Sequence, residues 1–197
     1  YTYTYDKADQ LIATTEPKDT DTSPERKTTF EYDLVGNLKK QTEPKGNLTS
    51  DPDDYTVTYD YDPVDQLVKV TNSLGHKITY EYDNTGNLVK VTEPKGNETT
   101  EDPDDYVTTY TYDLNHQLTK VTDAKGHSVE YTYDHDGNRT TVKDKEGTVT
   151  TTVYDERGLV KEVRVPHDDG VERITRFEYD EVGNRTKVIT PRGTETT

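Results

Sequence analysis

The sequence has no cysteine and no tryptophan, and only 27% of its 197 residues are hydrophobic. The absence of cysteine excludes disulfide bridges, thiolate metal sites and cysteine nucleophiles. No hydrophobic run approaches the length of a membrane-spanning helix, so we expect no membrane insertion. Motifs for a serine nucleophile or a phosphate-binding loop are also missing. We therefore expect no enzyme, no catalytic residue and no organic cofactor.

Negative charge dominates, because 40 Asp and Glu residues stand against 24 Lys and Arg, which gives a net charge of −16. Proteins bind nucleic acids largely through Lys and Arg that neutralise phosphates, so this balance excludes a nucleic-acid partner. High charge with low hydrophobicity is by itself typical of disordered chains. An internal repeat points the other way, since stacked repeats share a narrow core and need fewer apolar residues per unit.

The repeat is marked by a Tyr-Asp pair that occurs eight times, most often 21 residues after the previous one. A second aromatic residue usually stands two positions earlier, which in a β-strand places both rings on one face. We therefore predict an all-β chain of consecutive antiparallel hairpins, a single array of about eight units over residues 1–197. The rings of the pairs are predicted to form a ladder of stacked core side chains, made of Tyr5, Tyr32, Tyr61, Tyr82, Tyr112, Tyr133, Tyr154 and Tyr179.

A turn follows each pair, and the residue three positions after the Asp is Gly in five units and Asp9, Asp65 or His116 in the others. Gly, Asp and His adopt positive φ more readily than most residues, so this position is predicted to be left-handed, in a hairpin with a bulge. The Asp of the pair is predicted to open the turn by accepting backbone N–H bonds. The predicted turn residues are Asp33, Gly36, Asp83, Gly86, Asp134, Gly137, Gly158, Asp180 and Gly183.

The return strands are predicted to begin at Leu11, Leu38, Leu67, Leu88, Leu118, Arg139, Val160 and Arg185. A Val often follows three residues later, as Val91 follows Leu88, and in a regular strand this spacing places the two side chains on opposite faces. A second, tight turn rich in Pro and Gly ends the unit. Three of these second turns are enlarged, over residues 16–27, 43–54 and 93–105, and we expect them to line one side of the array.

The stretch from Tyr80 to Gly96 resembles the YD repeat of the Rhs family, whose pattern is roughly Tyr-x-Tyr-Asp-x-x-Gly-Asn-Leu followed by a Pro/Gly turn. The resemblance extends over almost the whole chain. It implies hairpins wound into a β-sheet spiral or solenoid, as in bacterial Rhs and wall-associated proteins, the cocoons of toxin complexes and the teneurins. In those families the repeats are a scaffold outside the cell, so the resemblance implies an extracellular or cell-surface protein of a bacterium or archaeon.

The sequence also departs from that family. It lacks the Rhs core motif associated with self-cleavage and carries no recognisable toxin domain, so neither autoproteolysis nor toxicity is expected. Eight units are too few to enclose a cargo. We expect the chain to be a segment or subunit of a longer array, whose partners are copies of itself or neighbouring repeats of a longer chain.

Two acidic turns, each followed by Tyr, supply carboxylates of the kind that bind calcium. The candidate ligands are Asp51, Asp53 and Asp54 in the first turn and Asp102, Asp104 and Asp105 in the second. Their spacing matches no EF-hand loop, and solvated acidic turns are common on protein surfaces, so both interpretations stay open.

Two functions fit these observations. The first is a structural scaffold, as a stalk, shell segment or filament subunit, that assembles by strand pairing and end-to-end stacking. The second is a surface adhesin that binds a glycan or a protein through the enlarged acidic turns. Tyr55 and Tyr106 lie in those turns outside the ladder and are the candidate ligand-facing rings.

Overall fold

The computed structural model describes residues 1–18, 20, 24–51, 53–98, 106–167 and 170–196. The chain divides into two compact units, Tyr1–Val107 (unit 1) and Thr108–Thr197 (unit 2). Both are built from β-strands joined by turns, and every strand pairing recorded within a unit is antiparallel. In the described part of the chain, no helix is long and apolar enough to cross a membrane.

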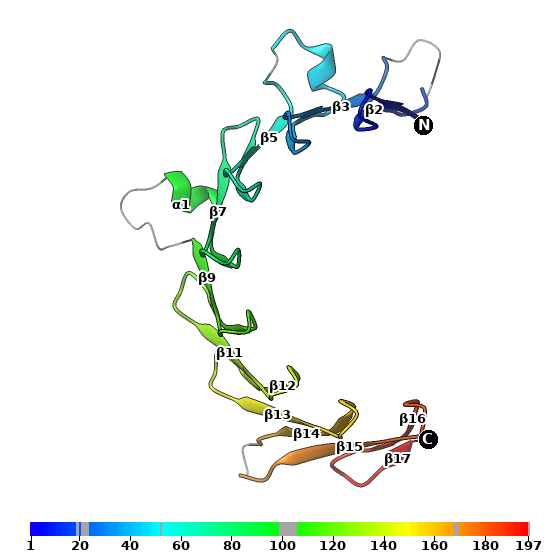
Figure 1. Cartoon of the computed structure of the whole chain (residues 1–197), viewed down its shortest axis with the longest axis vertical. Helices are drawn as coiled ribbons and strands as arrows, with labels where there is room; N and C mark the ends of the chain where they lie inside the picture. The colour runs from blue at the N-terminus through cyan, green and yellow to red at the C-terminus, as the bar shows by residue number, and fades with distance from the viewer. Residues whose placement is uncertain (19, 21–23, 52, 99–105, 168–169, 197) are drawn as a thin grey trace. The chain divides into compact units, whose positions relative to one another are not determined.

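Unit 1 is a row of hairpins in chain order, with two short helices between strands (Figure 1). Its elements are β1 (Thr2–Tyr5), β2 (Leu11–Thr15), β3 (Lys27–Tyr32), β4 (Leu38–Thr42), η1 (Gly46–Leu48), β5 (Thr56–Tyr61), β6 (Leu67–Asn72), β7 (Lys77–Tyr82), β8 (Leu88–Thr92) and α1 (Pro94–Glu98).

Unit 2 is also a row of hairpins, and its first strand begins at the last residue of unit 1. Its elements are β9 (Val107–Tyr112), β10 (Leu118–Thr122), β11 (Ser128–Tyr133), β12 (Arg139–Lys143), β13 (Val149–Tyr154), β14 (Val160–Val165), β15 (Arg173–Tyr179), β16 (Arg185–Ile189) and β17 (Glu195–Thr196). All eight return strands begin at the residues predicted from the sequence, and the prediction of consecutive antiparallel hairpins is confirmed. The prediction of a single array over the whole chain is not tested by the structure.

A β-bulge follows every Tyr-Asp turn, because the return strand contains one extra residue. In the hairpin of β7 and β8, Tyr80 lies opposite Val91 and Tyr82 opposite Leu88, with Val89 as the extra residue. Residues directly opposite one another share a face of the sheet, so Leu88 and Val91 lie on the same face as both rings. The expectation that Leu and Val point to opposite faces is therefore wrong.

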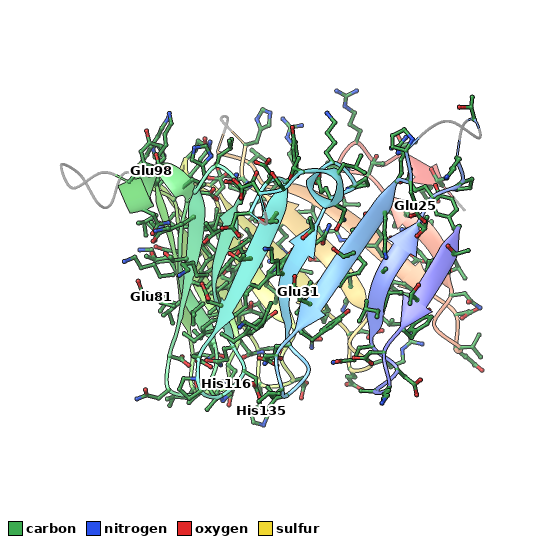
Figure 2. All side chains as sticks on the ribbon, turned by 90° about the horizontal axis from the view of Figure 1, so that it is seen from above. Glu25, Glu31, Glu81, Glu98, His116 and His135 are labelled. Carbon is green, nitrogen blue, oxygen red and sulfur yellow. The ribbon has the colours of Figure 1, made fainter. Side chains whose placement is uncertain are left out.

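The bulge separates two chemically different faces of the hairpin. Tyr, Val and Leu occupy one, which we call the aromatic face, while the other carries Thr, Lys and acidic side chains, as at the opposed pairs Thr79–Thr92 and Glu81–Lys90. Cross-strand ion pairs join Lys90 to Glu81 at 3.1 Å and Lys69 to Asp60 at 2.7 Å on this polar face. Figure 2 shows Glu31 and Glu81 along the strands of unit 1, away from the turns.

The aromatic rings do not build a closed core in the described residues, where Ala13 and Val107 are the only buried hydrophobic residues. Most rings of the Tyr-Asp pairs are half-buried, and Tyr5 is 56% exposed. A single layer of sheet covers each ring from one side only. The rings predicted to stack as core side chains therefore form a half-buried row. Interactions other than hydrophobic burial must join one hairpin to the next.

Hydrogen bonds from the Tyr hydroxyl groups supply one such connection. In six Tyr-Asp pairs, the hydroxyl donates to the backbone carbonyl of the first residue in the return strand of the preceding hairpin, at 2.8–3.1 Å. The donor and acceptor residues are Tyr32 and Leu11, Tyr61 and Leu38, Tyr82 and Leu67, Tyr133 and Leu118, Tyr154 and Arg139, and Tyr179 and Val160. Each bond joins the first strand of one hairpin to the adjacent return strand of the hairpin before it, so it ties neighbouring hairpins together.

Removing one of these hydroxyl groups is expected to destabilise the fold. The substitution Tyr82→Phe keeps the ring but leaves the carbonyl of Leu67 without its donor, which we expect to cost about 0.5–1.5 kcal/mol of unfolding free energy. The control is Tyr80→Phe on the same face, since the Tyr80 hydroxyl makes no hydrogen bond with a described residue. Urea denaturation measures both; an equal loss in the two variants would contradict a role for the Tyr82 hydroxyl.

Candidate functional site

In each unit, the Tyr-Asp turns lie at the same end of the strands, and we call this end the YD-turn edge. Figure 2 shows His116 and His135 there in unit 2. In each turn, the Asp Oδ1 atom accepts the N–H groups two and four residues later, as Asp83 does from Thr85 and Asn87 at 2.9 and 3.0 Å. The backbone N–H of Gly86 donates to the carbonyl of Asp83. The carboxylate therefore organises the turn.

All eight positions expected to be left-handed have positive φ. The three that are not glycine have φ values of 59° at Asp9, 63° at Asp65 and 62° at His116. The glycines, with φ from 76° to 104°, are Gly36, Gly86, Gly137, Gly158 and Gly183. The turn backbone therefore accepts a side chain where φ is close to 60°, whereas the larger φ values at the glycine turns are rarely adopted by residues with a side chain.

Hydrogen bonds lower the pKa values of five turn carboxylates, among them Asp33 and Asp83, below the usual 3.8. For Asp83, the largest causes of the lower pKa are the Thr85 hydroxyl and the Asn87 side-chain amide. For Asp33, desolvation acts to raise the pKa but is outweighed by hydrogen bonds from Asn37 and other turn residues. The pKa values of Asp134, Asp155 and Asp180 are lowered as well.

The second turns lie at the opposite edge, which we call the insertion edge. In unit 1, both short helices lie on this edge, away from the Tyr-Asp turns (Figure 1), and Figure 2 shows Glu25 and Glu98 there. The enlarged turns of unit 1 therefore share one edge wherever the structure describes them.

Two of the enlarged turns have the same internal structure, and each is organised by an Asn that is not among the predicted site residues. The Asn47 side-chain amide donates to the carbonyls of Lys27, Thr42 and Glu43, and its oxygen accepts from the Thr29 hydroxyl. Asn97 makes the equivalent bonds to Lys77, Thr92 and Glu93, and accepts from Thr79. The sequence carries a signal for this shared structure, because residues 27–76 are similar to residues 77–127. The repeat in this part of the chain therefore spans two hairpins instead of one.

These two turns are helical, where the sequence predicted tight turns. The N–H of Asn47 donates to the carbonyl of Glu43, and that of Asn97 to the carbonyl of Glu93, so each chain segment makes one helical turn. Gly46 is required by a close approach, since a Cβ there would lie 2.2 Å from the carbonyl oxygen of Asp54. By contrast, the short turn at Asp123 is tight, with the Gly126 N–H bonded to the Asp123 carbonyl.

The two candidate ligand-facing rings occupy equivalent places in these turns. Tyr55 is 43% exposed and Tyr106 is 38% exposed. The ammonium group of Lys45 lies 5.7 Å from the centre of the Tyr55 ring, and that of Lys95 lies 5.7 Å from the Tyr106 ring. Tyr55 has a φ of 54°, which is unfavourable for a bulky residue. The turn thus holds this ring in a strained and partly exposed position.

A groove of about 500 Å³ runs between two neighbouring turns of the insertion edge in unit 1. Its walls combine proline, leucine and tyrosine surface with charged groups of both signs. The lining residues are Pro24, Glu25 and Arg26 from the first turn, and Glu43, Pro44, Lys45, Leu48 and Tyr55 from the second. This groove is the place where one of the predicted ring residues meets a concave surface.

The three predicted calcium ligands that the structure describes, Asp51, Asp53 and Asp54, do not come together as a metal site. Asp53 pairs with Lys40 at 3.3 Å, and Asp51 accepts the N–H of Asp53. The described residues contain no group of three His, Cys, Asp or Glu side chains that could hold a metal ion. Asp102, Asp104 and Asp105 lie outside the described residues, so calcium binding stays a prediction.

Comparison with known proteins identifies the repeat. A family model described as RHS Repeat matches residues 61–98, 95–128, 112–149 and 154–195. The search of curated proteins returned no significant match. The crystal structure of TcdB2-TccC3-TEV is similar, with a TM-score of 0.61 and 15% identity over 95% of this chain, and this chain spans 12% of its length. The Tc holotoxin pore of Photorhabdus luminescens matches with a TM-score of 0.33 and 15% identity, over 95% of this chain and 15% of its own length.

The turn carboxylates predict how stability depends on pH. Because the folded pKa values of the five turn carboxylates named above lie below those of the unfolded chain, about 3.9 for Asp, their contribution is complete above that value and is lost as pH falls through the folded values. We expect the thermal midpoint to fall below about pH 4. Asp83→Asn should weaken this dependence, whereas Glu156→Gln, at an exposed turn position, should not. Melting curves followed by circular dichroism between neutral and acid pH would test this; equal acid sensitivity of the two variants would contradict it.

Proposed function

The chain belongs to the RHS repeat family, and from this membership we infer that it is a non-enzymatic wall segment of an extracellular β-sheet scaffold. Its neighbours in the assembly are copies of itself or repeats of a longer chain. The fold similarity to TcdB2-TccC3-TEV supports a scaffold role, because that far longer chain contains a stretch with the same hairpin arrangement.

The observation that carries this proposal is the row of Tyr hydroxyl bonds between hairpins. Each hairpin of such a row offers a carbonyl to the next, so the bonding pattern can be extended by further hairpins without a change in geometry. A wall needs a repeated connection of this kind, whereas a catalytic site is needed once.

Assembly is tested by light scattering of the chain over a wide range of protein concentration. A net charge of −16 opposes self-association, and salt screens that repulsion, with a Debye length of about 30 Å at about 0.01 M and about 3 Å at about 1 M. We expect the mass to rise above 22.5 kDa with concentration, and more strongly at high salt. Electron microscopy of the same samples would identify ordered assemblies. A mass that stays at 22.5 kDa under all conditions would contradict self-assembly.

A second candidate function, as a surface adhesin, is favoured by the groove beside Tyr55. An exposed aromatic ring next to Pro24, Pro44 and charged side chains suits a carbohydrate, whose faces stack on rings and whose hydroxyl groups bond to charges. The strain at Tyr55 supports this function, since unfavourable backbone conformations are often kept at binding sites.

The adhesin function predicts that Tyr55→Ala weakens glycan binding about tenfold, which corresponds to about 1.4 kcal/mol, while Tyr55→Phe retains most of it because the ring remains. A glycan array identifies the ligand, and calorimetry then compares the variants. Repeating the array with calcium and with a chelator tests the predicted acidic ligands at the same time. No binding to any glycan under either condition would reject this function.

A further inference from the structure

Two residues at the end of each Tyr-Asp turn vary together along the chain. We call the third residue after the Asp the left-handed residue, and the fourth the closing residue. The closing residue is Gln where the left-handed residue is Asp9, Asp65 or His116. It is Asn in four of the five turns with glycine, and Leu159 in the other.

A closing Gln lies against the left-handed residue of the following hairpin. A Cβ built on Gly36 would lie 3.1 Å from Nε2 of Gln10, and a Cβ on Gly86 would lie 3.1 Å from Nε2 of Gln66. Gln117 comes similarly close to Gly137, at 3.2 Å, and its amide lies 3.4 Å from the Gly137 carbonyl oxygen, to which it donates. The three glycines therefore leave the space that the Gln amide fills.

A closing Asn leaves room for a side chain on the following hairpin. The Asn37 amide donates to Oδ1 of Asp65 at 2.8 Å. A Cβ on Gly158 would lie 3.7 Å from Oδ1 of Asn138, an ordinary contact distance. The shorter Asn side chain therefore both admits an Asp and bonds to it.

The order of residues in the sequence follows the same rule. Each turn that closes with Gln is followed by a turn whose left-handed residue is Gly36, Gly86 or Gly137. The two left-handed side chains that have a preceding turn, Asp65 and His116, both follow a turn that closes with Asn. A positive φ alone does not require glycine, because Asp9 and Asp65 adopt φ values of 59° and 63°. The glycines have larger φ values of 76–104°, so backbone shape and the contact with the closing residue both favour glycine at those turns.

We propose that the closing residue selects which hairpin can follow, so that the YD-turn edge carries a pairing rule between neighbouring hairpins. A hairpin closing with Gln fits a partner with Gly at the left-handed position, and one closing with Asn fits a partner with Asp, His or Gly. This extends the proposed scaffold function, since the same rule would select the adjoining hairpin wherever repeats meet. The recognised partner is therefore another YD hairpin of defined turn sequence.

The rule is tested by placing an Asp at the left-handed position of a hairpin that follows a closing Gln, and of another that follows a closing Asn. Both Gly86→Asp and Gly158→Asp add one charge and one left-handed Asp, but only Gly86 lies against a Gln. We expect the thermal midpoint of Gly86→Asp to fall by about 2–4 °C more than that of Gly158→Asp, which is about 1 kcal/mol for a chain of this size. Adding Gln66→Asn should restore most of the loss, because it recreates the pair formed by Asn37 and Asp65.

Equal losses at both glycines, or no recovery on adding Gln66→Asn, would overturn the rule. If Gly86→Asp does not fold, the double variant with Gln66→Asn should fold, and failure of both would count against the proposal. Melting curves of the monomer at low concentration and low salt provide the readout. They are independent of the light-scattering test, so a failure of self-assembly and a failure of the pairing rule can be told apart.

Discussion

One extra residue in each return strand determines what the sheet presents to its surroundings. In the hairpin of β7 and β8, the bulge at Val89 brings Leu88 and Val91 onto the face that holds Tyr80 and Tyr82. Without the bulge, Leu88 would join the polar side chains on the other face. The left-handed turn residue makes the bulge possible, and the Asp carboxylate fixes the turn. The aromatic face therefore depends on a backbone feature that is repeated in every hairpin.

A single-layer sheet cannot bury its side chains on both sides, and the polar groups of this chain compensate. The hydroxyl of Tyr82 donates a hydrogen bond to the preceding hairpin, and the side-chain amide of Asn47 donates to three backbone carbonyls. Among the few buried residues are Thr42, Thr56 and Thr92, all at strand ends next to the enlarged turns. Hydrogen bonds to backbone carbonyls therefore supply part of the stability that a hydrophobic core supplies in other proteins. This explains how a chain with only 27% hydrophobic residues folds.

Local features of this fold could be predicted from the sequence, and features that join distant residues could not. The exchange of Gly with Asp9, Asp65 and His116 was enough to locate the left-handed positions, because φ depends on one residue. The face of Leu88 was assigned wrongly because its spacing from Val91 was counted along a regular strand, although a bulge was expected. The bonds of Asn47 to Lys27, 20 residues away, required knowledge of which strands are neighbours.

Substitutions are constrained differently at the two edges of the hairpins. One edge joins neighbouring hairpins, and the other carries the candidate binding groove. At the YD-turn edge, turns of neighbouring hairpins within a unit contact each other, as Asn37 contacts Asp65. Under the proposed pairing rule, a change in one such turn requires a change in its neighbour. At the insertion edge, the short turn at Asp123 and the helical turn at Glu43 both connect strands of the same kind. Loop length there can vary without a change in strand register. New binding properties are therefore gained most easily at the insertion edge, where the groove beside Tyr55 lies.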